Sequence, residues 1–230
     1  MQRCESLEIL DEMDLPDAAV AESYRELRMV HFWLGNTAAM LRLLKRAAHT
    51  DRGIRRVLDV GCGQGALLTA IRARLGLEVI GIDLRLAPAN TPVPIVTGNA
   101  VTDPLPRADV AVCMMLAHHL SEAELTAMIG NVARSCRRLI VLDLVRHPAP
   151  LVLFKAFVAP LLGKINASDG ATSIRRAYTA AEMRRIVDKA IREAGRPVKQ
   201  LRHTVAPLWI RQVVEIEWHG ELKAVKDKRL

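Results

Sequence analysis

Three glycines spaced two residues apart follow an apolar run in segment 57–66, which reads Val-Leu-Asp-Val-Gly-Cys-Gly-Gln-Gly-Ala. Glycine suits a turn where the backbone bends sharply and a ligand approaches without a Cβ in between. A strand, a glycine turn and a helix N-terminus together form a nucleotide-binding crevice at the carboxyl end of a parallel strand. Residues 61–66 also fit the dinucleotide-binding pattern, so the glycines alone do not identify the ligand.

The acidic residue before this turn separates two classes of ligand. Asp59 lies two residues before Gly61, where it would repel the doubly anionic pyrophosphate of a dinucleotide. S-adenosylmethionine (SAM) instead brings an ammonium and a sulfonium group and has no phosphate. The apolar run 77–82 ends in Asp83, at the distance of about 20 residues from the glycines at which an acid binds ribose hydroxyls. These residues favour SAM over NAD.

With these residues the chain resembles the class I SAM-dependent methyltransferase family. The resemblance rests on the Asp-x-Gly-x-Gly-x-Gly motif at 59–65 and on Gly-Ile-Asp at 81–83, and it continues through residues 98–100 and 116–120. It covers roughly residues 55–145. Within the family, the chain is most similar to small-molecule methyltransferases of the quinone- and polyphenol-biosynthesis type.

The resemblance implies which residues hold the cofactor. Asp59 and the turn would meet the methionine end of SAM, Asp83 the ribose, Leu84 one adenine face, and the loop at Asn99 the adenine edge. Many relatives carry Asp before the following alanine, so Asn99 departs from the pattern with an amide that both donates and accepts. The expected cofactor-binding residues are Asp59, Gly61, Cys62, Gly63, Gly65, Asp83, Leu84, Asn99, Ala100 and Met115.

Two adjacent histidines and an acid follow the next predicted strands. His118 and His119 come after the apolar run 109–114, and Asp143 ends the run 138–143. Histidine titrates near neutral pH and is the commonest general base. Adjacent residues of an extended chain point in opposite directions, so we expect at most one histidine to face a substrate. One interpretation is a His118–Asp143 pair that deprotonates a phenolic hydroxyl. The other is that both histidines make structural hydrogen bonds.

The elements that must position these residues form a Rossmann-like α/β fold. We expect a seven-stranded, mostly parallel sheet with an antiparallel final strand, N-terminal helices and a lid insertion after the fifth strand. The expected strands are 57–60, 77–82, 93–96, 109–114, 138–143, 199–205 and 210–218, with a proline-rich loop at 88–94. Two capping boxes, Ser121 with Glu124 and Thr179 with Glu182, predict helix starts.

The chain divides by composition into a cap, a cofactor domain and a tail. Residues 1–50 are expected to form a helical cap, whose first 20 residues are a loosely held arm or short helix and whose 21–48 segment is two helices joined at Gly35-Asn36. Residues 51–220 form the methyltransferase domain, and 221–230 a basic tail.

Within that domain, residues 148–178 are the predicted lid and acceptor pocket. The first part, 148–162, is an apolar helical segment, and 163–177 is predicted as a polar loop. Its apolar side chains favour an apolar acceptor, while Arg175, Arg176 and Tyr178 could anchor an acid or a hydroxyl.

The composition bears on cellular compartment, membrane association and nucleic-acid binding. The 230-residue chain has four cysteines without CxxC spacing and an acidic start, which together indicate a cytoplasmic protein. The longest apolar stretch, 151–162, is shorter than the about 20 residues that span a bilayer, although peripheral membrane contact stays open. The net charge of +8 could attract RNA, but no basic patch has interleaved aromatic residues, so no nucleic-acid partner is expected. No metal site is predicted.

The sequence therefore favours a SAM-dependent enzyme that methylates a hydroxyl of a small, rather apolar aromatic or polyketide-type acceptor. The preference for oxygen over carbon rests on the resemblance. The alternatives are a C-methyltransferase acting on a quinol or phenol ring, an RNA or protein methyltransferase, an NAD-dependent oxidoreductase, and a SAM-binding protein without activity. The oligomeric state is left open.

Overall fold

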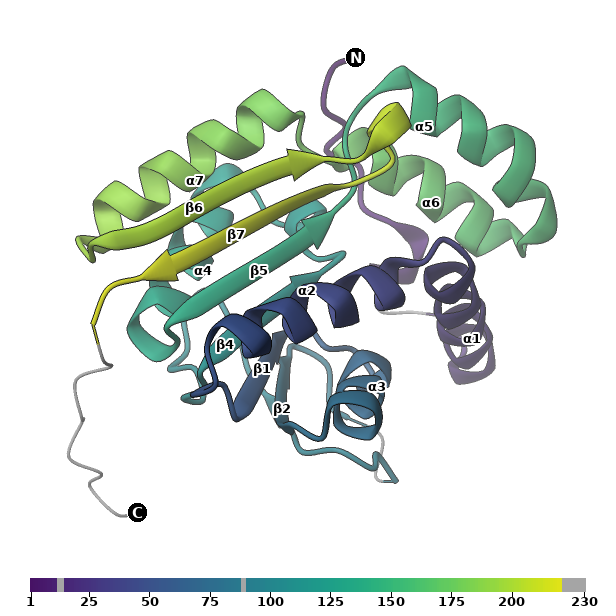
Figure 1. The fold of residues 1–230 in the computed structure, drawn as a ribbon. Coiled ribbons are helices and arrows are strands. Elements are labelled where there is room, and N and C mark those ends of the chain that lie inside the picture. Colours follow the sequence, from purple (N-terminus) through teal and green to yellow (C-terminus); the bar gives the residue numbers. More distant parts are fainter. Residues whose placement is uncertain (12–14, 88–89, 221–230) are drawn as a thin grey trace.

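A computed structural model of the protein describes residues 1–11, 15–87 and 90–220 (Figure 1). Its centre is a seven-stranded sheet in the order β3-β2-β1-β4-β5-β7-β6. The strands are β1 (Arg56–Val60), β2 (Glu78–Asp83), β3 (Ile95–Thr97), β4 (Val110–Met114), β5 (Arg138–Asp143), β6 (Val198–Val205) and β7 (Gln212–Trp218). Strands β1 to β5 pair in parallel, and β7 runs antiparallel to both β5 and β6. The predicted fold is confirmed.

Burial explains this arrangement. Strands β4 and β5 are apolar along nearly their whole length because both of their faces are covered. In β7, buried residues alternate with half-buried ones, as predicted for a strand with one wet face. Helices α2 (Asn36–Thr50) and α3 (Ala66–Leu75) pack on one face of the sheet, and α4 (Glu122–Ser135) and α7 (Ala180–Ala194) on the other (Figure 1).

The predicted helix boundaries are largely confirmed. Both capping boxes form, at Ser121 and at Thr179. Gly35 separates α1 (Asp17–Trp33) from α2 with a left-handed backbone, φ 69°, which a glycine adopts without strain. Residues 148–161 are helical as expected, in α5 (Pro148–Leu153), η3 (Phe154–Val158) and η4 (Ala159–Leu161).

The prediction of a polar loop at 163–177 is wrong, because this segment forms helix α6 (Lys164–Arg176). Its buried face carries polar residues as well as apolar ones, among them Asn166, Asp169 and Ser173. Each of these makes a hydrogen bond to the N-terminal part of the chain. An apolar repeat of helical period was therefore not visible in the sequence.

Of the two expectations for the start of the chain, a short helix is present and the loosely held arm is wrong for residues 1–11. Residues 1–11, here called the N-terminal segment, lie against α6 and include a short helix, η1 (Ile9–Asp11). The backbone N–H groups of Ile9 and Leu10 donate to the Asp169 carboxylate at 2.7 and 2.9 Å, and Cys4 N–H donates to Arg175 O at 3.1 Å. These long-range hydrogen bonds fix the segment across the carboxyl ends of the strands.

Two predicted regions reach beyond the described residues. The tail at 221–230 lies outside them, and so do the first two residues of the loop at 88–94. The third strand begins two residues later than predicted, at Ile95. Within the described part of the chain, no helix is long and apolar enough to cross a membrane.

Substitutions at two glycines, Gly81 and Gly130, test how tightly side chains pack against β2. A Cβ at Gly81 of β2 would meet Cys62 Sγ and lie 2.8 Å from Leu68 Cδ1. Gly81→Ala should therefore lower the free energy of unfolding by about 1–3 kcal/mol, as overpacking does. Gly130→Ala is the control, because the nearest atom to its Cβ, in α4, is 4.0 Å away, and alanine there should stabilise by up to about 1 kcal/mol. Equal effects in urea unfolding would contradict this packing.

Candidate active site

The glycine turn lies between β1 and α3 and joins the tip of β2. Gly61, Gly63 and Gly65 all have positive φ, at 70°, 53° and 78°. A Cβ would lie 2.7 Å from Leu116 Cδ2 at Gly61 and 2.6 Å from Val93 Cγ2 at Gly65. The turn therefore combines a left-handed backbone with close neighbours, which requires glycine.

Asp59 stands beneath this turn with its carboxylate removed from water. It is 2% exposed, and no hydrogen bond to its side chain is found among the described residues. Burial, together with the nearby charge of Asp83, raises the pKa of Asp59 well above its usual range. A buried carboxylate without a partner is costly, and a cationic ligand group at the turn would relieve that cost. This environment fits the ammonium group of SAM.

Three other predicted cofactor residues near the turn, Asp83, Leu84 and Cys62, differ in their contacts and exposure. The Asp83 carboxylate accepts hydrogen bonds from Gly63 N–H at 2.7 Å and from Arg85 N–H at 3.0 Å, so it already joins β2 to the turn. Leu84 is 70% exposed beside it. The Cys62 side chain points into the core against Gly81, which leaves only its backbone to meet a ligand.

The loop after β3 is shaped by its own turn and by a buried amide. Asn99 Oδ1 accepts from Val101 N–H at 2.9 Å. Asn131 Nδ2, from α4, donates to Ala100 O at 2.9 Å and to Asp103 O at 2.7 Å. No sequence pattern singles out Asn131, because it lies within an ordinary amphipathic helix.

The residues after β4 are held by β5. Met115 adopts a left-handed backbone, φ 58°, and its N–H donates to Leu142 O at 2.9 Å. The ten predicted cofactor residues therefore lie on or just beyond the carboxyl ends of β1 to β4, where parallel sheets bind nucleotides.

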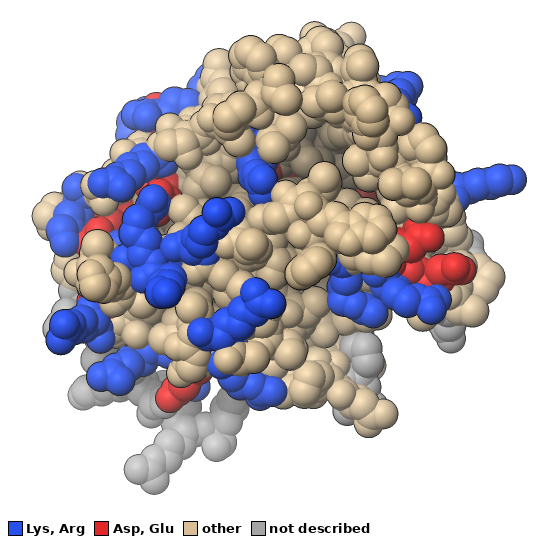
Figure 2. Space-filling view, turned by 45° about the vertical axis from the view of Figure 1, so that its right-hand side comes forward, with Lys and Arg blue, Asp and Glu red and all other residues tan. Residues whose placement is uncertain are grey.

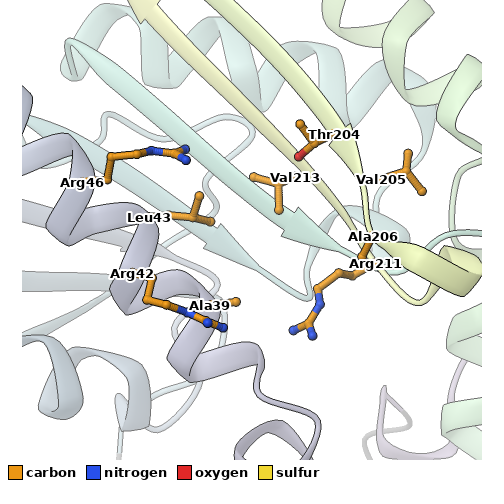
Figure 3. Close-up of a pocket in the computed structure, with 9 residues that line it drawn as sticks. All are labelled: Ala39, Arg42, Leu43, Arg46, Thr204, Val205, Ala206, Arg211 and Val213. Carbon is orange, nitrogen blue, oxygen red and sulfur yellow. The ribbon is translucent and has the colours of Figure 1, made fainter.

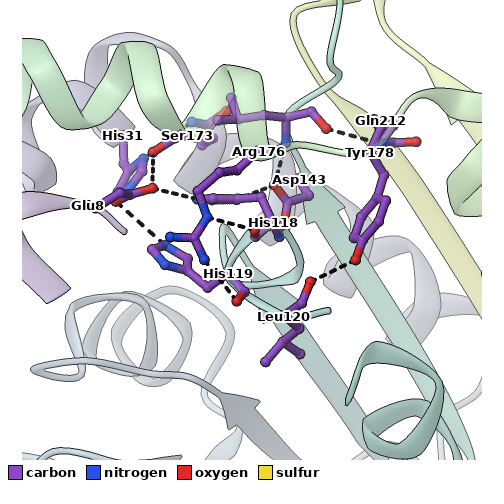
Figure 4. Close-up of polar contacts among 12 residues, drawn as sticks. Glu8, His31, His118, His119, Leu120, Asp143, Ser173, Arg176, Tyr178 and Gln212 are labelled. Carbon is purple, nitrogen blue, oxygen red and sulfur yellow. Dashed lines mark hydrogen bonds and ion pairs between the residues drawn. The ribbon is translucent and has the colours of Figure 1, made fainter. Parts of the chain in front are cut away.

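His118 and Asp143 form a buried pair at the ends of β4 and β5 (Figure 4). His118, in the short helix η2 (Ala117–His119), is 3% exposed and Asp143 1%. His118 Nδ1 lies 2.6 Å from Asp143 Oδ1, and His118 N–H donates to Oδ2 at 3.2 Å. Burial would raise the pKa of Asp143, but the charge and hydrogen bonds of His118 together with Leu144 N–H lower it.

The prediction that the two histidine rings point in opposite directions is wrong. Their centroids are 4.3 Å apart, because residues 117–119 form a helical turn and not an extended chain. His118 Nε2 lies 3.7 Å from Glu8 Oε1, and His119 Nε2 lies 3.8 Å from Glu8 Oε2. Both rings thus face one carboxylate of the N-terminal segment (Figure 4).

Glu8 is a site residue that the sequence did not reveal. Its side chain is buried and accepts a hydrogen bond from Ser173 Oγ at 2.6 Å. It lies 110 residues before His118 in the chain, and nothing in the acidic start distinguishes it from its neighbours. Only the packing of the N-terminal segment on α6 brings it to the histidines.

Arg176 and Tyr178 were expected as anchors for an acceptor, but they are buried and bind backbone carbonyls. Arg176 Nη2 donates to His119 O at 3.1 Å, and Tyr178 Oη donates to Leu120 O at 2.7 Å. Arg3 Nη2 also donates to Leu120 O, at 2.8 Å. These side chains fix the turn that carries the histidines.

Helix α1 reaches the same region. Arg28 Nη1 donates to Gln64 Oε1 at 3.3 Å, and His31 Nδ1 lies 3.3 Å from Asn36 Nδ2. Burial, with a smaller contribution from His118, lowers the pKa of His31 to about 4. Trp33, in contrast, is 60% exposed.

A groove on the face of the sheet that α2 covers is lined by basic side chains. This groove, of about 300 Å³ between α2 and the β6–β7 hairpin, is lined by Arg42, Arg46 and Arg211 (Figure 3). Arg46 is paired with Glu215 at 2.6 Å. Figure 2 shows Lys and Arg outnumbering Asp and Glu on the face that it displays.

The fold is shared with methyltransferases of solved structure. The plantazolicin methyltransferase BamL has a TM-score of 0.65 at 11% identity, covering 86% of this chain and 91% of its own. Magnesium protoporphyrin IX methyltransferase from Synechocystis PCC 6803 has 0.51 at 19%, covering 80% and 84%. The methyltransferase domain of bacterial CtHen1 has 0.57 at 16%, covering 80% and 97%. At these identities the similarity is one of fold.

A comparison of the sequence with protein families identifies more than the fold. No curated protein matches the chain. The model of a family described as "Methyltransferase domain" matches residues 32–155, a span that contains the glycine turn, Asp83 and both histidines. Because this match covers more than half of the chain, the protein belongs to the methyltransferase-domain family and is a class I SAM-dependent methyltransferase.

Proposed function

We propose that this enzyme transfers the methyl group of SAM to a hydroxyl group of a small, rather apolar aromatic or polyketide-type acceptor. The observation that carries the proposal is the buried His118–Asp143 pair at the carboxyl ends of β4 and β5, the same edge of the sheet that carries the glycine turn after β1. A polar cluster of this kind suits an acceptor that must lose a proton.

The cofactor supplies an activated methyl carbon when bound, and the chain's own residues bind and orient it. In this proposal Asp59 pairs with the ammonium group and Asp83 holds the ribose hydroxyls. Leu84 covers an adenine face, and the loop at Asn99 and Ala100 meets the adenine edge. Orientation of two reactants is worth about 7–11 kcal/mol of the barrier, so these contacts carry much of the catalysis.

The groups proposed to activate the hydroxyl are His118 and His119. Asp143 acts on His118 as a positioning residue, because its carboxylate holds Nδ1 of that ring. A phenol has a pKa of about 10, so it needs a nearby group that stabilises the phenolate at neutral pH.

The exposed apolar side chains of the proposed lid, residues 148–178, support an apolar acceptor. Val152, Phe157 and Leu161 are 64%, 70% and 67% exposed there, although large apolar side chains are usually buried. Two of the similar structures are named for plantazolicin and for magnesium protoporphyrin IX. The same exposed surface would allow peripheral contact with a membrane that dissolves the acceptor.

Calorimetry followed by an acceptor screen tests the proposal. S-adenosylhomocysteine (SAH) should bind saturably, whereas NAD should not bind. Soluble phenols, quinols and a short RNA should then be incubated with SAM, and products should carry a new O-methyl group. Binding of NAD alone would overturn the cofactor assignment. Methylation of ring carbon, or of RNA through the arginine groove, would overturn the hydroxyl assignment.

The raised pKa of Asp59 predicts how cofactor binding depends on pH. In the free protein Asp59 stays protonated to a higher pH than usual, whereas the ammonium of SAH favours the charged carboxylate. Binding should therefore release a proton, and the affinity should rise with pH by up to tenfold per unit until the pKa of the free site is passed. Calorimetry in two buffers of different ionisation enthalpy measures that proton. Asp59→Asn should bind weakly without a pH slope, and an unchanged slope in this variant would contradict the assignment.

A further inference from the structure

We propose that Glu8, His118 and His119 form a binding site for a divalent transition-metal ion. The three side chains offer one carboxylate oxygen and two imidazole nitrogens, and these donor atoms all lie within 4.8 Å of one another. They come from the N-terminal segment and from η2, two parts of the chain that α6 brings together (Figure 4).

The contacts of His118 with Asp143 and of Glu8 with Ser173 orient the donor atoms of these two residues toward each other. Nδ1 of His118 lies 2.6 Å from Asp143, so in the neutral form of the ring the proton stays on Nδ1 and the lone pair of Nε2 faces Glu8. The separations of 3.7 and 3.8 Å from the two Nε2 atoms to Glu8 are too long for hydrogen bonds. A lone pair that faces a carboxylate in a buried place is unfavourable unless a positive charge lies between them.

The separations themselves suit shared ligands of one ion. Metal–ligand bonds to imidazole nitrogen and carboxylate oxygen are about 2.0–2.2 Å long. Two ligands of the same ion are then about 3–3.5 Å apart, so small side-chain rotations would close the gaps seen here.

The surroundings orient the ligands as they do in metal sites. A metal-bound histidine typically donates its other ring N–H to a carboxylate, and ligating carboxylates are themselves hydrogen-bonded. Asp143 fills the first role toward His118, and Ser173 Oγ fills the second toward Glu8 at 2.6 Å. Arg3 and Arg176 donate to carbonyl oxygens of residues 118–120, while Glu8 and Asp143 supply two negative charges. Glu8 and His118 are deeply buried, and the side chain of His119 is a quarter exposed.

Two imidazoles with one carboxylate form the ligand set of catalytic Zn²⁺, and the same set binds Fe²⁺. Three protein ligands leave at least one coordination position for water or for a substrate oxygen. A hydroxyl bound there would lose its proton more readily. That role, unlike the binding site itself, rests on the proposed function.

Cobalt(II) is the probe that tests the site, because its visible absorption reports coordination directly. The full-length protein, freed of metal by a chelator, should bind one Co²⁺ with a new absorption band, and Zn²⁺ should displace it. Glu8→Gln and His119→Ala should weaken Co²⁺ binding by at least about 100-fold, and Ser173→Ala by about 10–100-fold. The matched controls are Glu5→Gln and His49→Ala, both at exposed positions, which should bind Co²⁺ as the unmodified protein does.

SAH binding, measured on every variant, separates the two proposals. Variants that bind SAH normally but lose Co²⁺ would establish the metal site independently of any activity. Absence of Co²⁺ binding, or binding that Glu8→Gln leaves unchanged, would overturn the site while SAH binding persists. Failure of the unmodified protein to bind SAH would count against the proposed function and leave the Co²⁺ result standing.

Discussion

Asp83→Ala should weaken SAH binding by about 100-fold or more. A carboxylate that accepts hydrogen bonds from two ribose hydroxyls contributes about 1.5–3 kcal/mol for each bond, and each 1.4 kcal/mol corresponds to a factor of ten in affinity. The same substitution removes the acceptor of Gly63 N–H at 2.7 Å and of Arg85 N–H at 3.0 Å. The glycine turn would then lose its side-chain link to β2 and keep only backbone bonds such as that from Gly61 N–H to Ile82 O at 2.9 Å. Calorimetric titration with SAH measures the combined loss.

Glu78→Ala is the control for this experiment. Glu78 begins the strand that Asp83 ends, and its exposed carboxylate pairs with Arg56 at 3.4 Å. Exposed ion pairs of this kind contribute at most about 1 kcal/mol to stability, and this one lies at the opposite edge of the sheet from the turn. Affinities that fall equally in both variants would indicate a general loss of structure and would contradict the ribose role.

Features that depend on neighbouring residues could be predicted from the sequence. The positive φ of the turn follows from its glycines, and the helix starts at 121 and 179 follow from side chains three residues apart. The apolar runs of the parallel strands are equally local, because burial on both faces removes polar residues from consecutive positions. The glycine turn and the strands that lead to it were therefore visible in the sequence.

The histidine cluster depends on contacts that are remote in the chain. The rings of His118 and His119 lie together because a helical turn follows β4, and no propensity in Leu-Ala-His-His predicts that turn. Glu8 joins them because α6 buries polar residues that hold the N-terminal segment. A helix whose buried face mixes polar with apolar residues resembles a loop in the sequence, so both α6 and the carboxylate that it positions were missed.

The same contacts imply that the His118–Asp143 pair contributes strongly to the free energy of unfolding. Asp143→Ala should lower the free energy of unfolding by about 3–5 kcal/mol, since it leaves the buried partner of a charged pair without its counterpart. Three donors lose their acceptor at once: the Nδ1 and backbone N–H groups of His118 and the backbone N–H of Leu144. Stability is commonly only about 5–15 kcal/mol, so the urea midpoint should fall far enough to be unmistakable.

Asp109, a carboxylate that accepts a similar set of hydrogen bonds, provides the control for the loss of stability in Asp143→Ala. Asp109 accepts from the backbone N–H groups of Arg55 and Arg56 and from Arg137, but its side chain is 26% exposed at the other edge of the sheet. Water can replace its bonds, so Asp109→Ala should cost distinctly less than Asp143→Ala. Asp143→Asn, which keeps one acceptor oxygen, should fall between the two. Equal losses for Asp109→Ala and Asp143→Ala would mean that burial of the histidine pair adds nothing to its strength, and the idea of a rigid cluster at the ends of β4 and β5 would fail.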